Sequence, residues 1–277
     1  MDIPPNWTVI ERRTVGPFTT SMVLQRPDDS TVAWSAWHHR KGHGLIDRAT
    51  PISAEPSSWW APQQRGWWIA VLFIIGSSCF AVGSFPPTAS LLGSAAGSVF
   101  FIGSIFFTSA AYLQFYEASN EGDSVTGVDR TGRLLAFRPQ SIGWWASVIQ
   151  LVGTLFFNLS TFSALGDLST LQEETLVWAP DALGSIAFLL ASGLALVEVC
   201  SRLWCWNPDS REWRIAGINM VGSIAFGISA VGARVILSTG DLNNATVANS
   251  FTFIGAVMFF IGAVLLVPAA SSASNDA

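Results

Sequence analysis

Charged residues are scarce in this sequence: they make up 12% of its 277 residues, whereas hydrophobic residues make up 50%. Soluble globular domains carry about 25% charged residues. A chain with so few of them lacks the polar surface needed to cover a water-soluble globule of this size. The composition therefore argues against a soluble protein and indicates one that lies in a membrane.

Lysine and arginine are absent from three of the segments that separate the apolar stretches, namely residues 86–90, 166–180 and 238–249. Seven of the fourteen basic residues precede residue 66, and six more lie in the other connecting segments. Only Arg234 lies toward the membrane surface at which the three segments without lysine and arginine are expected. Because basic residues near helix ends stay in the cytoplasm, this asymmetry predicts that both termini are cytoplasmic.

Residue sets that support catalysis or metal binding are also missing. The sequence contains no phosphate-binding loop and no Ser/His/Asp arrangement, and all three histidines fall within residues 38–43. The three cysteines lie outside the lysine-free segments, so we expect no structural disulfide. Cys200 and Cys205 have a poor spacing for a metal site and no histidine near them. We therefore predict a protein that is not an enzyme and has no cofactor or metal.

The apolar residues are gathered into six stretches, near 67–85, 91–116, 144–165, 182–201, 215–237 and 251–267. Each approaches or exceeds the roughly 20 residues that an α-helix needs to cross the hydrocarbon core of a bilayer. Helices are favoured over barrel strands, which would be about 10 residues long and would alternate in polarity. The sequence predicts an all-α integral membrane protein with six transmembrane helices over residues 66–269.

One pattern recurs in these stretches. In the first, third and fifth, a tryptophan is followed nine residues later by glycine and thirteen residues later by phenylalanine, at Trp67/Gly76/Phe80, Trp144/Gly153/Phe157 and Trp213/Gly222/Phe226. The other three stretches share a glycine and a phenylalanine, at Gly103/Phe107, Gly184/Phe188 and Gly255/Phe259. Glycine lets neighbouring helices approach closely, and tryptophan anchors a helix at the headgroups. The pattern predicts three tandem two-helix hairpin repeats.

The segment "WWIAVLFIIGSSCF" followed by "VFFIGSIFFTSAAYLQFYEA" resembles the YrhK-like group of uncharacterised membrane proteins, which are built from short two-helix units. The resemblance covers about residues 66–268, and the motifs that carry it are helix-packing motifs. It implies a membrane location and a helical fold, and it brings no catalytic residues.

The N-terminal segment, residues 1–65, is predicted to be cytoplasmic. Residues 21–37 contain two short alternating runs around a Pro-Asp-Asp-Ser turn, which is typical of a β-hairpin. The run "HHRKGHG" that follows favours a basic juxtamembrane strip against anionic lipid, and a metal site is the alternative. The loop 117–142 is also hairpin-like, and the polar tail, residues 270–277, is predicted to be disordered.

Polar side chains inside the predicted helices are the candidate functional residues, because such residues are costly in a bilayer unless they are paired or hydrated. Five of them fall toward the cytoplasmic ends of their helices and predict a polar layer: Gln114, Glu117, Gln150, Glu198 and Asn219. The alternative interpretation is structural, with Glu198 paired to Arg202 one turn on and the amides bonded across helices.

Arg234 lies near the opposite membrane surface, where Asp181 begins the fourth apolar stretch. We expect an ion pair between these two residues at the outer face, and an anion or substrate site is the alternative.

Two classes of function remain. The first is a non-enzymatic structural, interaction or lipid-associated membrane protein. The second is a transport or channel-like protein whose polar layer forms a vestibule open to the cytoplasm. In either case we predict a multi-pass location in the plasma membrane, contact with the bilayer and with anionic lipid, a homo-oligomer as a further possibility, and no nucleic-acid partner.

Overall fold

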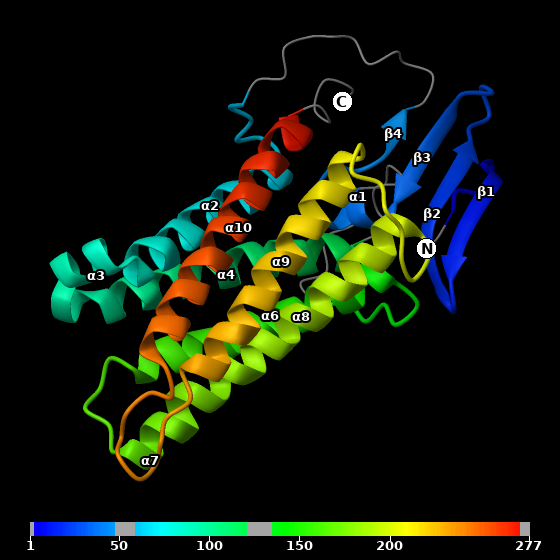
Figure 1. The fold of residues 1–277 in the computed structure, drawn as a ribbon. Helices are drawn as coiled ribbons and strands as arrows, with labels where there is room; N and C mark the ends of the chain where they lie inside the picture. Colours follow the sequence, from blue (N-terminus) through cyan, green and yellow to red (C-terminus); the bar gives the residue numbers. More distant parts are fainter. Residues whose placement is uncertain (1–2, 48–58, 121–134, 272–277) are drawn as a thin grey trace.

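A computed structural model describes residues 3–47, 59–120 and 135–271, and it contains a bundle of long helices with a small β-sheet at one end (Figure 1). Among the described residues, six helices are long and apolar enough to cross a membrane, as the sequence predicts. They are α2 (Arg65–Ser84), α4 (Ala96–Ser119), α6 (Ile142–Ser163), α8 (Ala179–Cys200), α9 (Arg211–Gly232) and α10 (Ala245–Ser271). The hairpin predicted in loop 117–142 falls mostly on residues 121–134, and the predicted tail mostly on 272–277, both outside the described ranges.

Two of the predicted connecting loops are helical. Residues 86–90 belong to α3 (Pro86–Leu92), which continues through η1 (Gly93–Ala95) into α4. The loop predicted over 166–180 is wrong from Thr170 onward, because α7 (Thr170–Gln172) and the π-helical η2 (Glu173–Trp178) run into α8. A capping box between Ser169 and Gln172 and the acidic residues of the next turn stabilise this helix start.

The six helices form a closed ring in which each packs against the next, in the order α2, α4, α6, α8, α9, α10 and back to α2. Paired glycines set the approach within the hairpins α2/α4, α6/α8 and α9/α10. A Cβ built on Gly103 would lie 3.1 Å from the carbonyl oxygen of Gly76, and one on Gly184 would lie 3.0 Å from that of Gly153. The third hairpin repeats this contact, because a Cβ on Gly255 would lie 3.1 Å from the carbonyl oxygen of Gly222.

Six buried phenylalanines fill the interior of the ring, one from each helix. Phe80, Phe157 and Phe226 of alternate helices meet at ring-centroid distances of 5.9, 6.2 and 6.5 Å. The other three helices contribute a second triangle, with centroid distances of 5.5, 5.9 and 6.2 Å, formed by Phe107, Phe188 and Phe259. Rings from alternate helices can touch only across the interior, so these two triangles close it.

The sheet is antiparallel, and its strands follow the chain order β1 (Thr8–Val15), β2 (Phe18–Gln25), β3 (Thr31–Ser35) and β4 (Ile46–Asp47). Strands β2 and β3 occupy the segment in which the sequence predicts a hairpin. Their inner face carries Met22, Leu24, Val32 and Trp34, which pack against Ile142 at the start of α6. This apolar contact seats the sheet on the bundle, and we call that end of the bundle the sheet end.

Candidate functional site

A five-residue helix, α1 (Ala36–Arg40), leads directly from β3 into the sheet end, where it contacts α4, α6 and α8. The residues predicted to form a basic strip against anionic lipid are instead buried inside the protein. His39 and Arg40 are each 2% exposed, and Lys41 is 5% exposed. The reason is helical spacing: Trp37 and Arg40 are three residues apart and share one face of α1, so the apolar contact of Trp37 carries Arg40 inward with it.

Arg40 forms the centre of a buried ion pair. Its Nη2 atom donates to Glu198 Oε2 at 2.8 Å and its Nε atom donates to the same oxygen at 3.0 Å. Its Nη1 atom donates to Gln114 Oε1 at 3.1 Å. The alternative partner for Glu198, Arg202, does not fit, because α8 ends at Cys200 and the helical turn that would align the pair is missing.

Glycine makes room for this pair. A Cβ built on Gly143, the second residue of α6, would lie 2.9 Å from Glu198 Oε1 and 3.6 Å from Arg40 Cδ. Any larger side chain at this position would push the carboxylate away. Arg40 thus bonds the N-terminal segment to α4 and α8, and Gly143 of α6 packs against the ion pair.

Glu117, another member of the predicted polar layer, is bonded to the start of α2. Its carboxylate accepts a hydrogen bond from Arg65 Nη1, and its main-chain carbonyl lies 2.9 Å from His39 Nε2. The Arg65 guanidinium also lies 5.1 Å from the centroid of the Tyr116 ring. Glu117 therefore links α2, α4 and α1.

Gln150 and Asn219 lie deeper, where they line a cavity of about 30 Å³ together with Arg40 and Lys41. The Lys41 ammonium lies 5.8 Å from the centroid of the Phe73 ring. Burial lowers the pKa of Lys41 well below its ordinary value; the Arg40 charge lowers it further, and Glu198 opposes the shift. All five residues of the predicted polar layer thus face the segment that carries α1, through direct bonds or through this cavity.

Two histidines complete the contact between the N-terminal segment and the ring. His38 Nε2 lies 3.3 Å from Glu212 Oε1 of α9. His43 is buried against the Trp37 ring at a centroid distance of 6.3 Å. Burial lowers the pKa of His43 to about 3, helped by the charges of His38 and Lys41. The contacts of the N-terminal segment with the ring were not predicted from the sequence. The one signal for them is that a buried Glu117 or Glu198 without a partner would be energetically costly.

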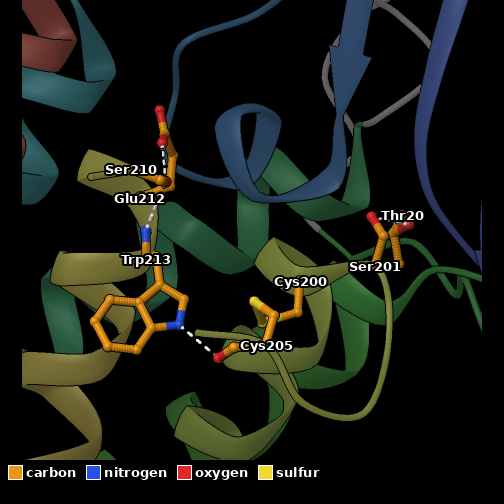
Figure 2. The surroundings of a disulfide bond; sticks show 7 residues. All are labelled: Thr20, Cys200, Ser201, Cys205, Ser210, Glu212 and Trp213. Atoms are coloured by element: carbon orange, nitrogen blue, oxygen red, sulfur yellow. Dashed lines mark hydrogen bonds between the residues drawn. A yellow bond between two sulfur atoms is a disulfide. The ribbon is translucent and has the colours of Figure 1, made fainter. Parts of the chain in front are cut away.

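Contrary to the sequence prediction, Cys200 and Cys205 form a disulfide, shown in Figure 2. Helix α8 ends at Cys200, and Ser201 adopts a left-handed conformation with φ 52°, which turns the chain back on itself. The turn brings the two cysteine Cα atoms to 5.5 Å, within the usual range for a disulfide. The prediction was based only on the redox compartment, and it did not consider the turn after α8 that brings the two cysteines together.

The disulfide loop, residues 200–205, is in contact with both the sheet and α9 (Figure 2). Thr20 Oγ1 of β2 donates to Ser201 Oγ at 2.8 Å, and Trp213 Nε1 donates to the Cys205 carbonyl at 3.1 Å. The other tryptophans of the sequence pattern make the same contact eight residues back, from Trp67 to the Trp59 carbonyl and from Trp144 to that of Ala136. In α2, α6 and α9, the tryptophan indole thus bonds the start of the helix to the loop that precedes it.

At the opposite end, the expected ion pair of Asp181 with Arg234 is not formed. In the part of the chain that the structure describes, no carboxylate lies within ion-pair distance of Arg234, whose guanidinium lies 5.6 Å from the centroid of the Trp178 ring. The Trp178 indole donates to the Ala230 carbonyl at 2.8 Å, and this bond holds the ring beside Arg234. No group of three His, Cys, Asp or Glu side chains among the described residues could hold a metal ion.

Comparison with protein-family models, curated proteins and solved structures finds no significant match to this chain.

Proposed function

We propose that this protein is a non-enzymatic, structural or interaction membrane protein whose helical ring holds the N-terminal sheet at one membrane surface. The observation that carries the proposal is the buried ion pair of Arg40 with Glu198. A polar layer that serves transport needs water, whereas here Gln114 and Glu198 bind a side chain of the same protein. The two phenylalanine triangles beyond this layer support the same proposal.

The finer features of the fold belong to this proposal. We place the sheet end in the cytoplasm, since ten of the eleven basic residues that the structure describes lie toward it, and we place the protein in the plasma membrane. The disulfide at this end runs against the cytoplasmic placement, because disulfides are rare in a reducing compartment. We regard the three hairpins as tandem repeats, and the matched glycine contacts and tryptophan bonds support this. The likeness to the YrhK-like group remains part of the proposal.

The proposed partners are the bilayer, with anionic lipid at the sheet end, and a second copy of the chain. Trp59, Trp204 and Trp206 are 70%, 67% and 73% exposed in the loops before α2 and α9. Tryptophans at such positions lie at the level of the lipid headgroups. Arg214, exposed at the same end, adds a positive charge that favours anionic lipid.

Solute flux tests the proposal. The full-length protein in proteoliposomes should take up small ions and neutral solutes no faster than protein-free liposomes. The variant Arg40→Gln, which weakens the contact of α1 with the ring, should behave in the same way. Uptake by the native protein would contradict the structural role.

A transport or channel-like function is the second candidate, and the cavity lined by Lys41, Gln150 and Asn219 is the observation that favours it. Transport would require α1 to leave the sheet end and the phenylalanine triangles to separate. In that case Arg40→Gln should raise flux above that of the native protein, with the exposed-site variant Arg214→Gln as the control.

A further inference from the structure

Lys41 is buried, and its ammonium lies beside the Phe73 ring, 5.8 Å from the ring centroid. The residue is 5% exposed, and among the described residues its ammonium forms no hydrogen bond and no ion pair. A buried charge without a partner is strongly unfavourable, so such groups are paired, neutralised or bound to a ligand. Because Lys41 lines a cavity, a ligand bound in that cavity could contact its ammonium.

The charges around the cavity are unequal. Arg40 and Lys41 are two cations, and the carboxylate that faces them, Glu198, is already bonded to Arg40. The other buried carboxylate at this end, Glu117, is bonded to Arg65. One positive charge is therefore left over when Lys41 is protonated, and the complementary ligand is an anion with a single charge.

Hydrogen-bond donors and size narrow the ligand further. Gln150 and Asn219 place carboxamide groups on the same cavity wall, and a carboxamide can donate two hydrogen bonds. The volume of about 30 Å³ is small, which favours a monatomic anion over a large organic anion such as gluconate. Phe73, Phe188 and Phe259 provide apolar walls, as suits a weakly hydrated ion.

We propose that this cavity binds a small monovalent anion of the size of chloride or bromide, held by the Lys41 ammonium and the carboxamides of Gln150 and Asn219. This site adjoins the ion pair that carries the structural role, since Arg40 also lines the cavity, and anion binding goes beyond that role. An anion bound there neutralises the leftover charge and stabilises the packing of α1 on the ring.

The test is the thermal stability of the purified full-length protein in sodium chloride, sodium bromide and sodium gluconate at the same ionic strength. We expect Tm to rise with chloride and bromide and not with gluconate, which is too large for the cavity. In Lys41→Met the halide concentration needed for half of the rise should increase at least tenfold, as expected for the loss of a charged hydrogen bond. The control Arg214→Met should respond to halide like the native protein.

Two results would overturn the inference: an equal Tm of the native protein in all three salts, or an unchanged halide response in Lys41→Met. Should Lys41→Met fail to fold, Ala191→Val decides, because it fills the cavity and leaves Lys41 in place; a retained halide response there also overturns the inference. The salt dependence of Tm and the solute flux are separate measurements. Halide binding without flux is consistent with the proposed structural role, whereas flux would contradict the structural role and leave the anion site unaffected.

Discussion

Arg40 connects the N-terminal segment to the ring, and its removal would leave Glu198 buried and charged without a partner. Breaking one side of a buried ion pair costs about 3–5 kcal/mol, whereas replacing both partners by apolar residues of similar volume is often neutral. We therefore expect Arg40→Met to lower Tm strongly and Arg40→Met/Glu198→Met to recover most of the loss. Unfolding in detergent measures both, with exposed Arg214→Met as the control. Equal losses in the single and double variants would contradict the ion-pair account.

His43 predicts a loss of stability in acid. Its pKa is lowered from 6.5 to about 3 in the folded protein, so the folded state keeps it neutral while the unfolded state takes up a proton below pH 6.5. Its contribution is complete above pH 6.5 and is lost at about 1.4 kcal/mol per pH unit as the pH falls toward 3. The groups that act on it are His38, Lys41, Arg211 and Glu212.

The substitution His43→Gln tests this pH dependence. Tm of the native protein should fall between pH 6.5 and pH 4, and the variant should show a shallower fall. The window ends at pH 4 so that it stays above the range in which Asp28, with its pKa below 3.8, titrates. Parallel pH profiles for the two proteins would show that another group controls acid stability.

At the scale of helices, the glycine contacts explain how the hairpins pack. Gly184 and Gly193 both lie in α8, yet a Cβ on Gly184 would lie 3.0 Å from the Gly153 carbonyl oxygen, and the nearest atom to one on Gly193 is 3.9 Å away. Gly184→Ala should cost about 1–3 kcal/mol through overpacking. Gly193→Ala should be neutral or stabilising by up to about 1 kcal/mol, as helix propensity predicts. Unfolding in detergent measures the stability of both variants. An equal loss of stability in Gly184→Ala and Gly193→Ala would contradict the packing explanation.

The disulfide constrains the loop between α8 and α9. Closing so short a loop stabilises a protein by about 2 kcal/mol in the chain-entropy model. Cys200→Ser/Cys205→Ser should therefore lower Tm modestly and speed amide hydrogen exchange in loop 200–205 and in β2, which bonds this loop through Thr20. Cys79→Ser, which removes the free cysteine, is the matched control. Unchanged exchange in β2 would show that the loop does not secure the sheet.

The elements differ in how far they can be predicted from sequence. Apolar runs of about 20 residues predict the six helices, because a lipid-facing backbone has few other options. Strand β1 was missed because its side chains are exposed on both faces, and the alternation that marks a half-buried strand is therefore absent. The start of the α7–η2–α8 helix was missed because its first turns are polar.

The candidate site shows the same division. The five residues of the predicted polar layer were singled out because a polar side chain within an apolar helix stands out. Their partner Arg40 was missed because it is 158 residues from Glu198 in sequence, in a segment that looks like a charged surface strip. Its burial depends on the sheet, which directs α1 into the ring, and no local pattern contains that information.

For the whole molecule, the central claim is that α1 fills the sheet end and that the ring is closed beyond it. The phenylalanine triangles join all six helices, so the interior is sealed by the residues that recur in the three hairpins. Gln150 and Asn219 lie between these triangles and α1, which makes them the positions most sensitive to water.

Cysteine accessibility at these two positions tests the claim most directly. In a Cys79→Ser background that keeps the disulfide intact, Gln150→Cys, Asn219→Cys and the exposed control Arg214→Cys would be treated in nanodiscs with a membrane-impermeant maleimide. The account predicts rapid labelling at 214, with labelling at 150 and 219 slower by at least a hundredfold, a ratio that an open population of about 1% would give. Labelling at 150 and 219 as fast as at 214, in folded protein, would mean a water-filled vestibule and would contradict the account.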